Sequence, residues 1–163
     1  MPRELIYSVL ICGDRMTSTI ARLRALSWPE RKLLLAAVML LPFFWIGLRV
    51  LGLRRLQNLL DRLPPFRRHQ FPNDVPTTVG ALVNIAGRYA PGPATCLTRS
   101  LFLSWLLRGW GVSCELRIGV RLNDGALEAH AWVEHLGMPI NDADDIALRF
   151  APFDGLIPFS SFS

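Results

Sequence analysis

Long apolar runs in the N-terminal half of the chain predict helices. Residues 27–30 (Ser-Trp-Pro-Glu) have the form of a helix start, because Ser and Glu three positions apart can cap each other's backbone N–H groups and Pro is favoured in the first turn. Sixteen residues without charge follow, from Leu33 to Leu48. Because Pro42 lies inside this run and proline interrupts helical hydrogen bonding, we expect two helices, over residues 28–41 and 43–62.

The same uncharged run is a candidate for contact with a membrane. A helix that spans a bilayer needs about 20 consecutive apolar residues, and this run is shorter and contains a proline. We therefore predict the buried core of a helical N-terminal subdomain over residues 17–63, with a partner-binding or membrane-surface face as the alternative. Met16 begins a smoother sequence than Met1 does, and we expect translation to start there.

The C-terminal half changes from helical to alternating periodicity. Residues 64–76 are rich in proline and arginine and predict a linker, and helical spacing returns over residues 77–89 and 97–107. Apolar and polar residues then alternate over 114–121, before an Asn-Asp-Gly turn and a second alternating strand over 126–134. A short third strand is expected over 138–142. Helices followed by antiparallel strands predict an α+β domain over residues 77–163.

The amino-acid composition excludes several classes of protein. Hydrophobic residues make up 51% and charged residues 19% of the 163 residues, which excludes a disordered chain and allows one core of ordinary size. The three cysteines, Cys12, Cys96 and Cys114, are too few for a disulfide framework or a four-thiolate zinc site. We therefore expect a protein of the reducing cytoplasm.

The net charge of +5 is unevenly distributed along the chain. Between Arg22 and Arg68 there are ten basic and two acidic residues, whereas from Gly111 to the C-terminus there are three basic and eight acidic residues. Only the first segment suits an anionic partner such as a membrane surface. Its interleaved side chains are aliphatic rather than aromatic, so we expect no nucleic-acid binding. His130 and His135 fall on opposite faces of a strand, so we expect no metal and no other cofactor.

One cysteine, one histidine and one carboxylate form a candidate catalytic set. Cys96 follows a Pro/Gly loop at the start of a helix, where the helix dipole and unpaired N–H groups favour a thiolate and an oxyanion; a buried structural cysteine is the alternative. His130 lies on the polar face of the second strand beside Trp132. The neighbouring third strand brings Asp142, or Asn141 if the register shifts by one, within reach of the imidazole. This order of groups is that of papain-like amide chemistry.

These residues stand in motifs that resemble those of a known family. The motifs are Cys96-Leu97-Thr98-Arg99-Ser100-Leu101, Ala129-His130-Ala131-Trp132-Val133-Glu134 and Asn141-Asp142. The chain resembles the transglutaminase-like cysteine proteases that mature lasso peptides, over about residues 77–155. The helical stretch 26–64 is similar to the N-terminal region of the stand-alone members.

The resemblance implies a papain-like or transglutaminase-like cysteine protease that removes the leader peptide from a lasso-peptide precursor before a macrolactam is closed. Carried over by motif, Cys96 is the nucleophile, His130 is the general base and acid, and Asp142 is the carboxylate that orients the histidine. The resemblance implies two further partners, a separate leader-binding protein (a recognition element for such precursors) and an ATP-dependent cyclase.

Several alternatives stay open at this point. Asn141, Asp144 or Asp145 is the alternative to Asp142, and Trp132 and Ser100 are candidate substrate contacts, with core packing as their alternative. An amide acyltransferase or deamidase would use the same three groups with a different acyl acceptor. A non-catalytic scaffold in the same maturation complex is the alternative from another class of protein.

Overall fold

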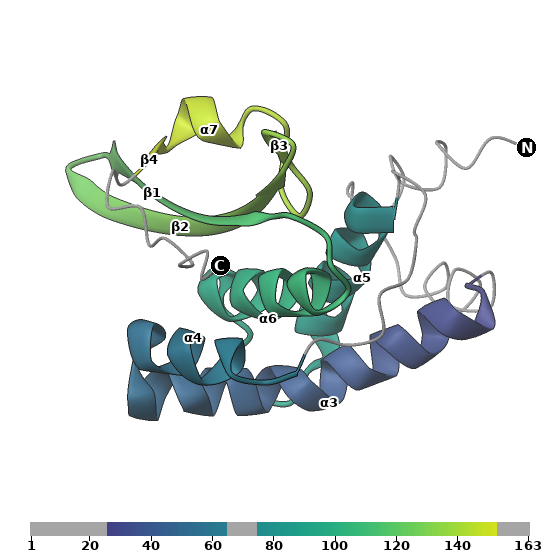
Figure 1. The fold of residues 1–163 in the computed structure, drawn as a ribbon. Coiled ribbons are helices and arrows are strands. Elements are labelled where there is room, and N and C mark those ends of the chain that lie inside the picture. The colour runs from purple at the N-terminus through teal and green to yellow at the C-terminus, as the bar shows by residue number, and fades with distance from the viewer. Residues whose placement is uncertain (1–25, 65–74, 153–163) are drawn as a thin grey trace, which may run out of the picture.

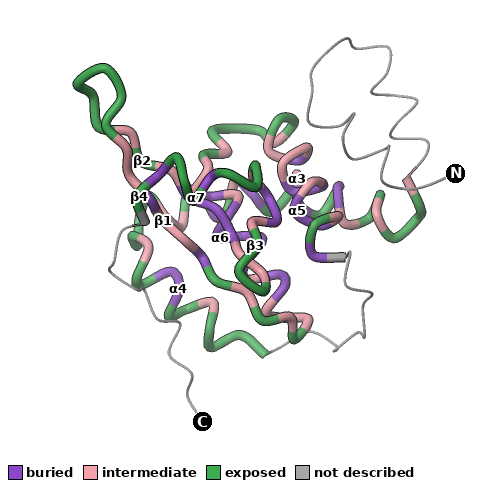
Figure 2. The backbone as a smooth tube through the Cα atoms, turned by 90° about the horizontal axis from the view of Figure 1, so that it is seen from above, coloured by how far each residue is buried: buried purple, intermediate pink, exposed green. Residues whose placement is uncertain are grey.

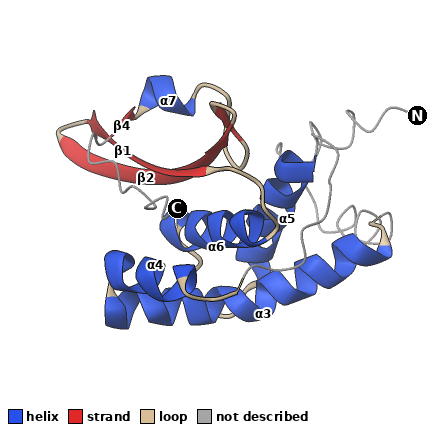
Figure 3. Cartoon of the chain, viewed as in Figure 1, coloured by secondary structure: helices blue, strands red, loops and turns tan. Residues whose placement is uncertain are grey.

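The computed structural model describes residues 26–64 and 75–152. In Figure 1 the helices α3 to α6 lie together below a curved antiparallel sheet, and the short helix α7 lies on the other side of that sheet. Figure 3 shows the same separation, with the long helices on one face of the strands. The α+β class predicted from the sequence is confirmed. The predicted start at Met16 and most of the predicted linker lie outside the described residues.

The first helix among the described residues, α3, runs from Trp28 to Leu51 and begins as predicted. Glu30 Oε2 accepts hydrogen bonds from the backbone N–H of Ser27 at 2.6 Å and from its hydroxyl at 2.7 Å. The bond from the Ser27 N–H is the glutamate half of the capping box that the Ser-Trp-Pro-Glu sequence indicates.

The predicted break near Pro42 is wrong, because α3 continues through the proline and ends at Leu51. Leu41 and Phe44, close to the proline on either side, are buried. Burying such side chains contributes about 2 kcal/mol each, which offsets the about 3 kcal/mol that an interior proline costs a helix. The chain breaks instead at Gly52, whose φ of 74° favours glycine, and α4 follows from Leu53 to Asp61.

Two further helices, α5 (Val75–Tyr89) and α6 (Cys96–Gly109), confirm the helices predicted over 77–89 and 97–107 and extend them by a few residues. They pack with α3 and with the inner face of the sheet in one cluster of buried side chains. Phe44 and Phe102 meet edge to face in this cluster, with ring centroids 5.2 Å apart. The cluster consists of Leu34, Ala37, Leu41, Phe44, Leu56, Val79, Val83, Ala86, Leu101, Phe102, Leu103, Leu106, Leu107, Leu116, Val133 and Ile140.

The sheet has the strand order β3-β2-β1-β4, and every neighbouring pair is antiparallel. The strands are β1 (Glu115–Asn123), β2 (Ala126–His135), β3 (Met138–Pro139) and β4 (Ala151–Pro152). The predicted hairpin turn is confirmed, since Asp124 and Gly125 both have positive φ. Its tip is exposed, as Figure 2 shows at the end of β1 and β2.

The predicted third strand over 138–142 is too long, because β3 ends at Pro139. The backbone N–H of Ile140 still donates to the Val133 carbonyl at 3.0 Å. At Asn141 a side chain then takes the place of the backbone, and its Oδ1 accepts the Val133 N–H at 2.8 Å. The edge of β2 is therefore completed by a side chain rather than by a longer strand.

The outer face of the sheet carries a second, smaller cluster of buried residues, Trp132, Ile146 and Phe150, below α7 (Ile146–Arg149). Gly119 permits this packing. A Cβ atom at this position would lie 2.8 Å from the Phe150 side chain and 2.9 Å from the Trp132 ring. The predicted division into a helical subdomain and a second domain stays a prediction.

Candidate functional site

Cys96 is the first residue of α6, as the sequence predicts. Thr95 is the N-cap residue, and its hydroxyl oxygen accepts the backbone N–H of Thr98 at 3.2 Å. Cys96 is partly exposed. The helix dipole and the unpaired N–H groups of the first turn therefore act at a thiol that a substrate can reach.

Ser100 attaches α6 to the edge of β2. Its hydroxyl donates to the Ala131 carbonyl at 2.9 Å, and both residues are buried. Four residues later along α6, the backbone carbonyl of Ser104 accepts a hydrogen bond of 3.7 Å from the thiol of Cys114, the residue directly before β1. Glu115, at the start of β1, pairs with Glu134 near the end of β2. Ser104 therefore lies nearer the end of β2 than Ser100 does, so α6 and β2 run in the same direction. Cys96 lies one turn, or about 5.4 Å along the helix axis, before Ser100.

The structure brings His130 and Asp142 together. His130 Nε2 and Asp142 Oδ2 are 2.6 Å apart, and each side chain is 24% exposed, so the pair can be reached from solvent. An ionised carboxylate only accepts hydrogen bonds, so with Asp142 ionised Nε2 is the donor in this pair. The His130 ring stacks on Trp132 at 6.4 Å and packs against Phe150 at 5.2 Å, measured between ring centroids. These contacts hold the orientation of the imidazole.

The other candidates for the third position contact different partners. Asp145 lies 4.0 Å from Arg149, and Asp144 is exposed. Asn141 is buried, and its side chain bonds Ser100 and Val133 instead of the histidine. Of the four residues that the sequence left open, Asp142 is the one that contacts the imidazole.

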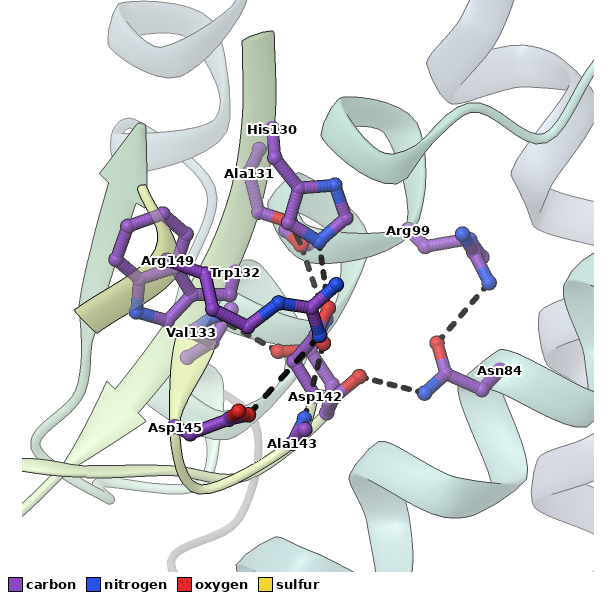
Figure 4. A network of polar contacts seen from close by, with 12 residues as sticks. Asn84, Arg99, His130, Ala131, Trp132, Val133, Asp142, Ala143, Asp145 and Arg149 are labelled. Atoms are coloured by element: carbon purple, nitrogen blue, oxygen red, sulfur yellow. Dashed lines mark hydrogen bonds and ion pairs between the residues drawn. The ribbon is translucent and has the colours of Figure 1, made fainter. Parts of the chain in front are cut away.

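Asn141 joins three elements behind this pair. Its Nδ2 donates to the Ser100 hydroxyl at 3.0 Å on α6, and its Oδ1 accepts the Val133 N–H on β2. Its carbonyl accepts Nδ2 of Asn84 on α5 at 2.7 Å. Asn84 and Arg99, which Figure 4 shows beside this network, are joined by a hydrogen bond of 3.2 Å from Arg99 Nη1 to Asn84 Oδ1. The network fixes the backbone immediately before Asp142.

The sequence analysis missed Asn84 and Arg99 as supports of the site. An Asn inside an apolar helix is a signal for such a role, but its partner lies 57 residues further along the chain. Gly80, on the same helix, approaches the same segment. A Cβ atom at Gly80 would come closer than any contact distance to the Ile140 carbonyl oxygen, so α5 touches this backbone directly.

Ser100 and Trp132, the predicted substrate contacts, are fully buried. The Ser100 hydroxyl is used by Ala131 and Asn141, and Trp132 Nε1 donates to Glu134 Oε1 at 2.8 Å. Both side chains pack inside the protein, which agrees with core packing, the alternative for both residues.

Cys114 differs from Cys96 in its surroundings. It packs against the main core cluster, and burial raises the pKa of its thiol, an effect that its contact with Ser104 and the charge of Arg108 only partly oppose. A raised pKa keeps this thiol protonated and unreactive near neutral pH. Within residues 26–64 and 75–152, no group of three or more His, Cys, Asp or Glu side chains is placed to hold a metal ion.

The sequence profile of the transglutaminase-like superfamily matches residues 36–153. The match begins within α3 and includes Cys96, His130 and Asp142. Searches of curated proteins and of solved structures gave no match.

Proposed function

Because the chain belongs to the transglutaminase-like superfamily, whose members are generally cysteine peptidases or acyltransferases, we propose that it is a cysteine peptidase. Its proposed substrate is the precursor of a lasso peptide, from which it removes the leader before a macrolactam is closed. The observation that carries the proposal is the His130–Asp142 pair at 2.6 Å, on the strand to which the Cys96 helix is attached. The motifs around these residues, which resemble the lasso-peptide proteases, support the choice of substrate.

The proposed reaction starts at the Cys96 sulfur. His130 Nε2 is bonded to Asp142, so Nδ1 is the nitrogen that takes the thiol proton. The thiolate attacks the scissile carbonyl carbon, and the N–H groups at the start of α6 stabilise the oxyanion. His130 then returns the proton to the leaving amine, which is the new N-terminus of the core peptide, and the leader remains as a thioester on Cys96.

Hydrolysis of the thioester completes the cycle. His130 removes a proton from water, the resulting hydroxide adds to the thioester carbonyl, and the Cys96 thiolate leaves. Asp142 holds the imidazole and stabilises its protonated form in both halves of the reaction. The amine that is released is the group a cyclase needs for ring closure, which is why we propose that a leader-binding protein and an ATP-dependent cyclase work beside this enzyme.

The test is incubation of the precursor and its leader-binding protein with the wild type, Cys96→Ala or Cys114→Ala, followed by mass spectrometry. We expect cleavage at one junction by the wild type and by Cys114→Ala, and none by Cys96→Ala. Equal cleavage by all three proteins would remove Cys96 from the mechanism.

The acyl acceptor separates a peptidase from an acyltransferase or deamidase. In isotopically labelled water a peptidase places one labelled oxygen in the new carboxylate of the leader. Incorporation of an added amine in its place would identify an acyltransferase. A change in mass at a glutamine side chain, with the backbone intact, would identify a deamidase.

A further inference from the structure

The face of α3 that points away from the core is an exposed apolar stripe. Its residues follow one another at intervals of three, four or seven positions, which places them on one side of a helix. We call the following set the α3 stripe: Trp28 (68% exposed), Leu35 (65%), Met39 (63%), Phe43 (68%), Ile46 (49%) and Val50 (73%). No residue from Leu33 to Leu48 carries a charge. Scattered apolar residues are normal on a surface, but a continuous stripe of this length marks an interaction site.

The opposite face of α3 is packed in the core, which limits how the helix can contact a membrane. Leu34, Ala37, Leu41 and Phe44 are buried against α5 and α6, so the helix cannot leave the protein without opening its core. An 18-residue window of α3 has a mean hydropathy of 2.2, and 22% of that window is buried. By length and composition the helix is able to cross a membrane, but its packing fixes one face in the protein. It is therefore suited to lie flat on an apolar surface.

The exposed charges of α3 and α4 favour an anionic surface. Lys32, Arg49, Arg54 and Arg55 are exposed on α3 and α4. The two acidic residues of these helices are occupied: Glu30 caps α3, and Asp61 pairs with Arg108 at 2.9 Å. The Lys32 ammonium lies 5.3 Å from the centre of the Trp28 ring, a combination suited to the boundary between lipid headgroups and hydrocarbon.

We propose that α3 binds the protein to the surface of a membrane that contains anionic lipids, with the stripe in the interface and the basic residues among the headgroups. A protein partner would need a polar rim and specific hydrogen bonds around an apolar centre. Apart from Asp61, which pairs with Arg108, the exposed charges of α3 and α4 are basic, and the uncharged run from Leu33 to Leu48 carries no Ser, Thr, Asn or Gln side chain for such hydrogen bonds. In Figure 1 α3 lies on the far side of the helices from the sheet, so lipid bound there leaves the sheet accessible.

The test is flotation of the full chain with vesicles of phosphatidylcholine alone or mixed with phosphatidylglycerol. The stripe variant carries four substitutions to glutamine, Leu35→Gln, Met39→Gln, Phe43→Gln and Ile46→Gln. The matched control carries four at exposed leucines elsewhere, Leu122→Gln, Leu127→Gln, Leu136→Gln and Leu148→Gln. Circular dichroism and thermal unfolding verify that each variant is folded.

We expect the wild type and the control to float with the phosphatidylglycerol vesicles and the stripe variant to remain in solution. Replacing Arg54 and Arg55 by glutamine is expected to weaken this binding by about five-fold for each charge removed. The proposal is overturned if the wild type does not float, or if the folded stripe variant floats equally well. It is also overturned if sedimentation shows self-association that only the stripe variant loses while no protein binds vesicles, because the stripe would then be a protein interface.

Discussion

At the residue scale, two neighbours in the sequence divide the work of the site. Asp142 contacts His130, whereas Asn141 bonds Ser100 and Val133 and thereby fixes the backbone from which Asp142 projects. The sequence placed both residues within reach of the histidine but left open which of them contacts it. Strand adjacency predicts proximity to within one residue, and the choice between them depends on side-chain partners in α6 that are about forty positions away.

Asn141→Ala separates the two roles. The substitution leaves the buried Val133 N–H without its partner, and we expect it to lower the free energy of unfolding by about 2 kcal/mol. Cleavage is also expected to slow, because the Asp142 backbone is released. Urea denaturation measures the first effect, and rates of leader removal measure the second. Asp144→Ala, at an exposed neighbour, is the control and should leave the free energy of unfolding unchanged. An Asn141→Ala protein as stable as the wild type would show that the network does not support the fold.

The two described cysteines are expected to differ in reactivity. Burial raises the pKa of Cys114, so at a given pH below that pKa its thiolate fraction is smaller than that of an ordinary thiol. Cys96 is partly exposed at the start of α6, so the reagent can reach it. Iodoacetamide should therefore modify Cys96 well before Cys114, as followed by peptide mass mapping over time near neutral pH. Equal rates for both cysteines would contradict this description of their surroundings.

At the element scale, the starts of α3 and α6 and the hairpin could be predicted, but the course of α3 through Pro42 and the start of α4 at Leu53 could not. The capping residues of α3 and the Asp-Gly turn act over three or four positions, so the sequence contains the whole cause. The continuation of α3 depends on Leu41 and Phe44 packing against helices that follow much later in the chain. The early end of β3 likewise depends on a side chain that replaces its backbone.

The contact of α5 with the segment before Asp142 gives a prediction for this element. Replacing glycine by alanine inside a helix ordinarily stabilises it by about 1 kcal/mol. At Gly80 the added methyl group would clash with the Ile140 carbonyl, so we expect the opposite sign, a loss of about 1–3 kcal/mol. Thermal or urea unfolding of Gly80→Ala decides between the two signs. Thr77→Ala, at an exposed position on the same helix, is the control.

At the scale of the whole molecule, the sheet that carries His130 and the helix α3 lie on opposite sides of α6. The main core cluster joins α3 to α5, α6 and the inner face of the sheet. A chain bound to lipid through α3 would therefore hold His130 and Asp142 away from the bilayer. In the sequence, the charge of the N-terminal half indicated contact with an anionic surface, and the motifs of the C-terminal half indicated a catalytic site. Their relative placement follows from packing between distant segments, which periodicity does not specify.

The completed edge of β2 has a consequence for how a peptide can enter. Many proteins that act on extended peptides receive them as an additional strand, through unpaired backbone groups at a sheet edge. Here the Ala131 carbonyl is bonded by Ser100, the Val133 N–H by Asn141 and the Val133 carbonyl by Ile140. These three groups, between the Ala131 carbonyl and the Val133 carbonyl, are therefore not available to pair with a bound peptide and cannot set its register. For the proposed peptidase, we therefore expect the choice of scissile bond to depend in part on the proposed leader-binding protein.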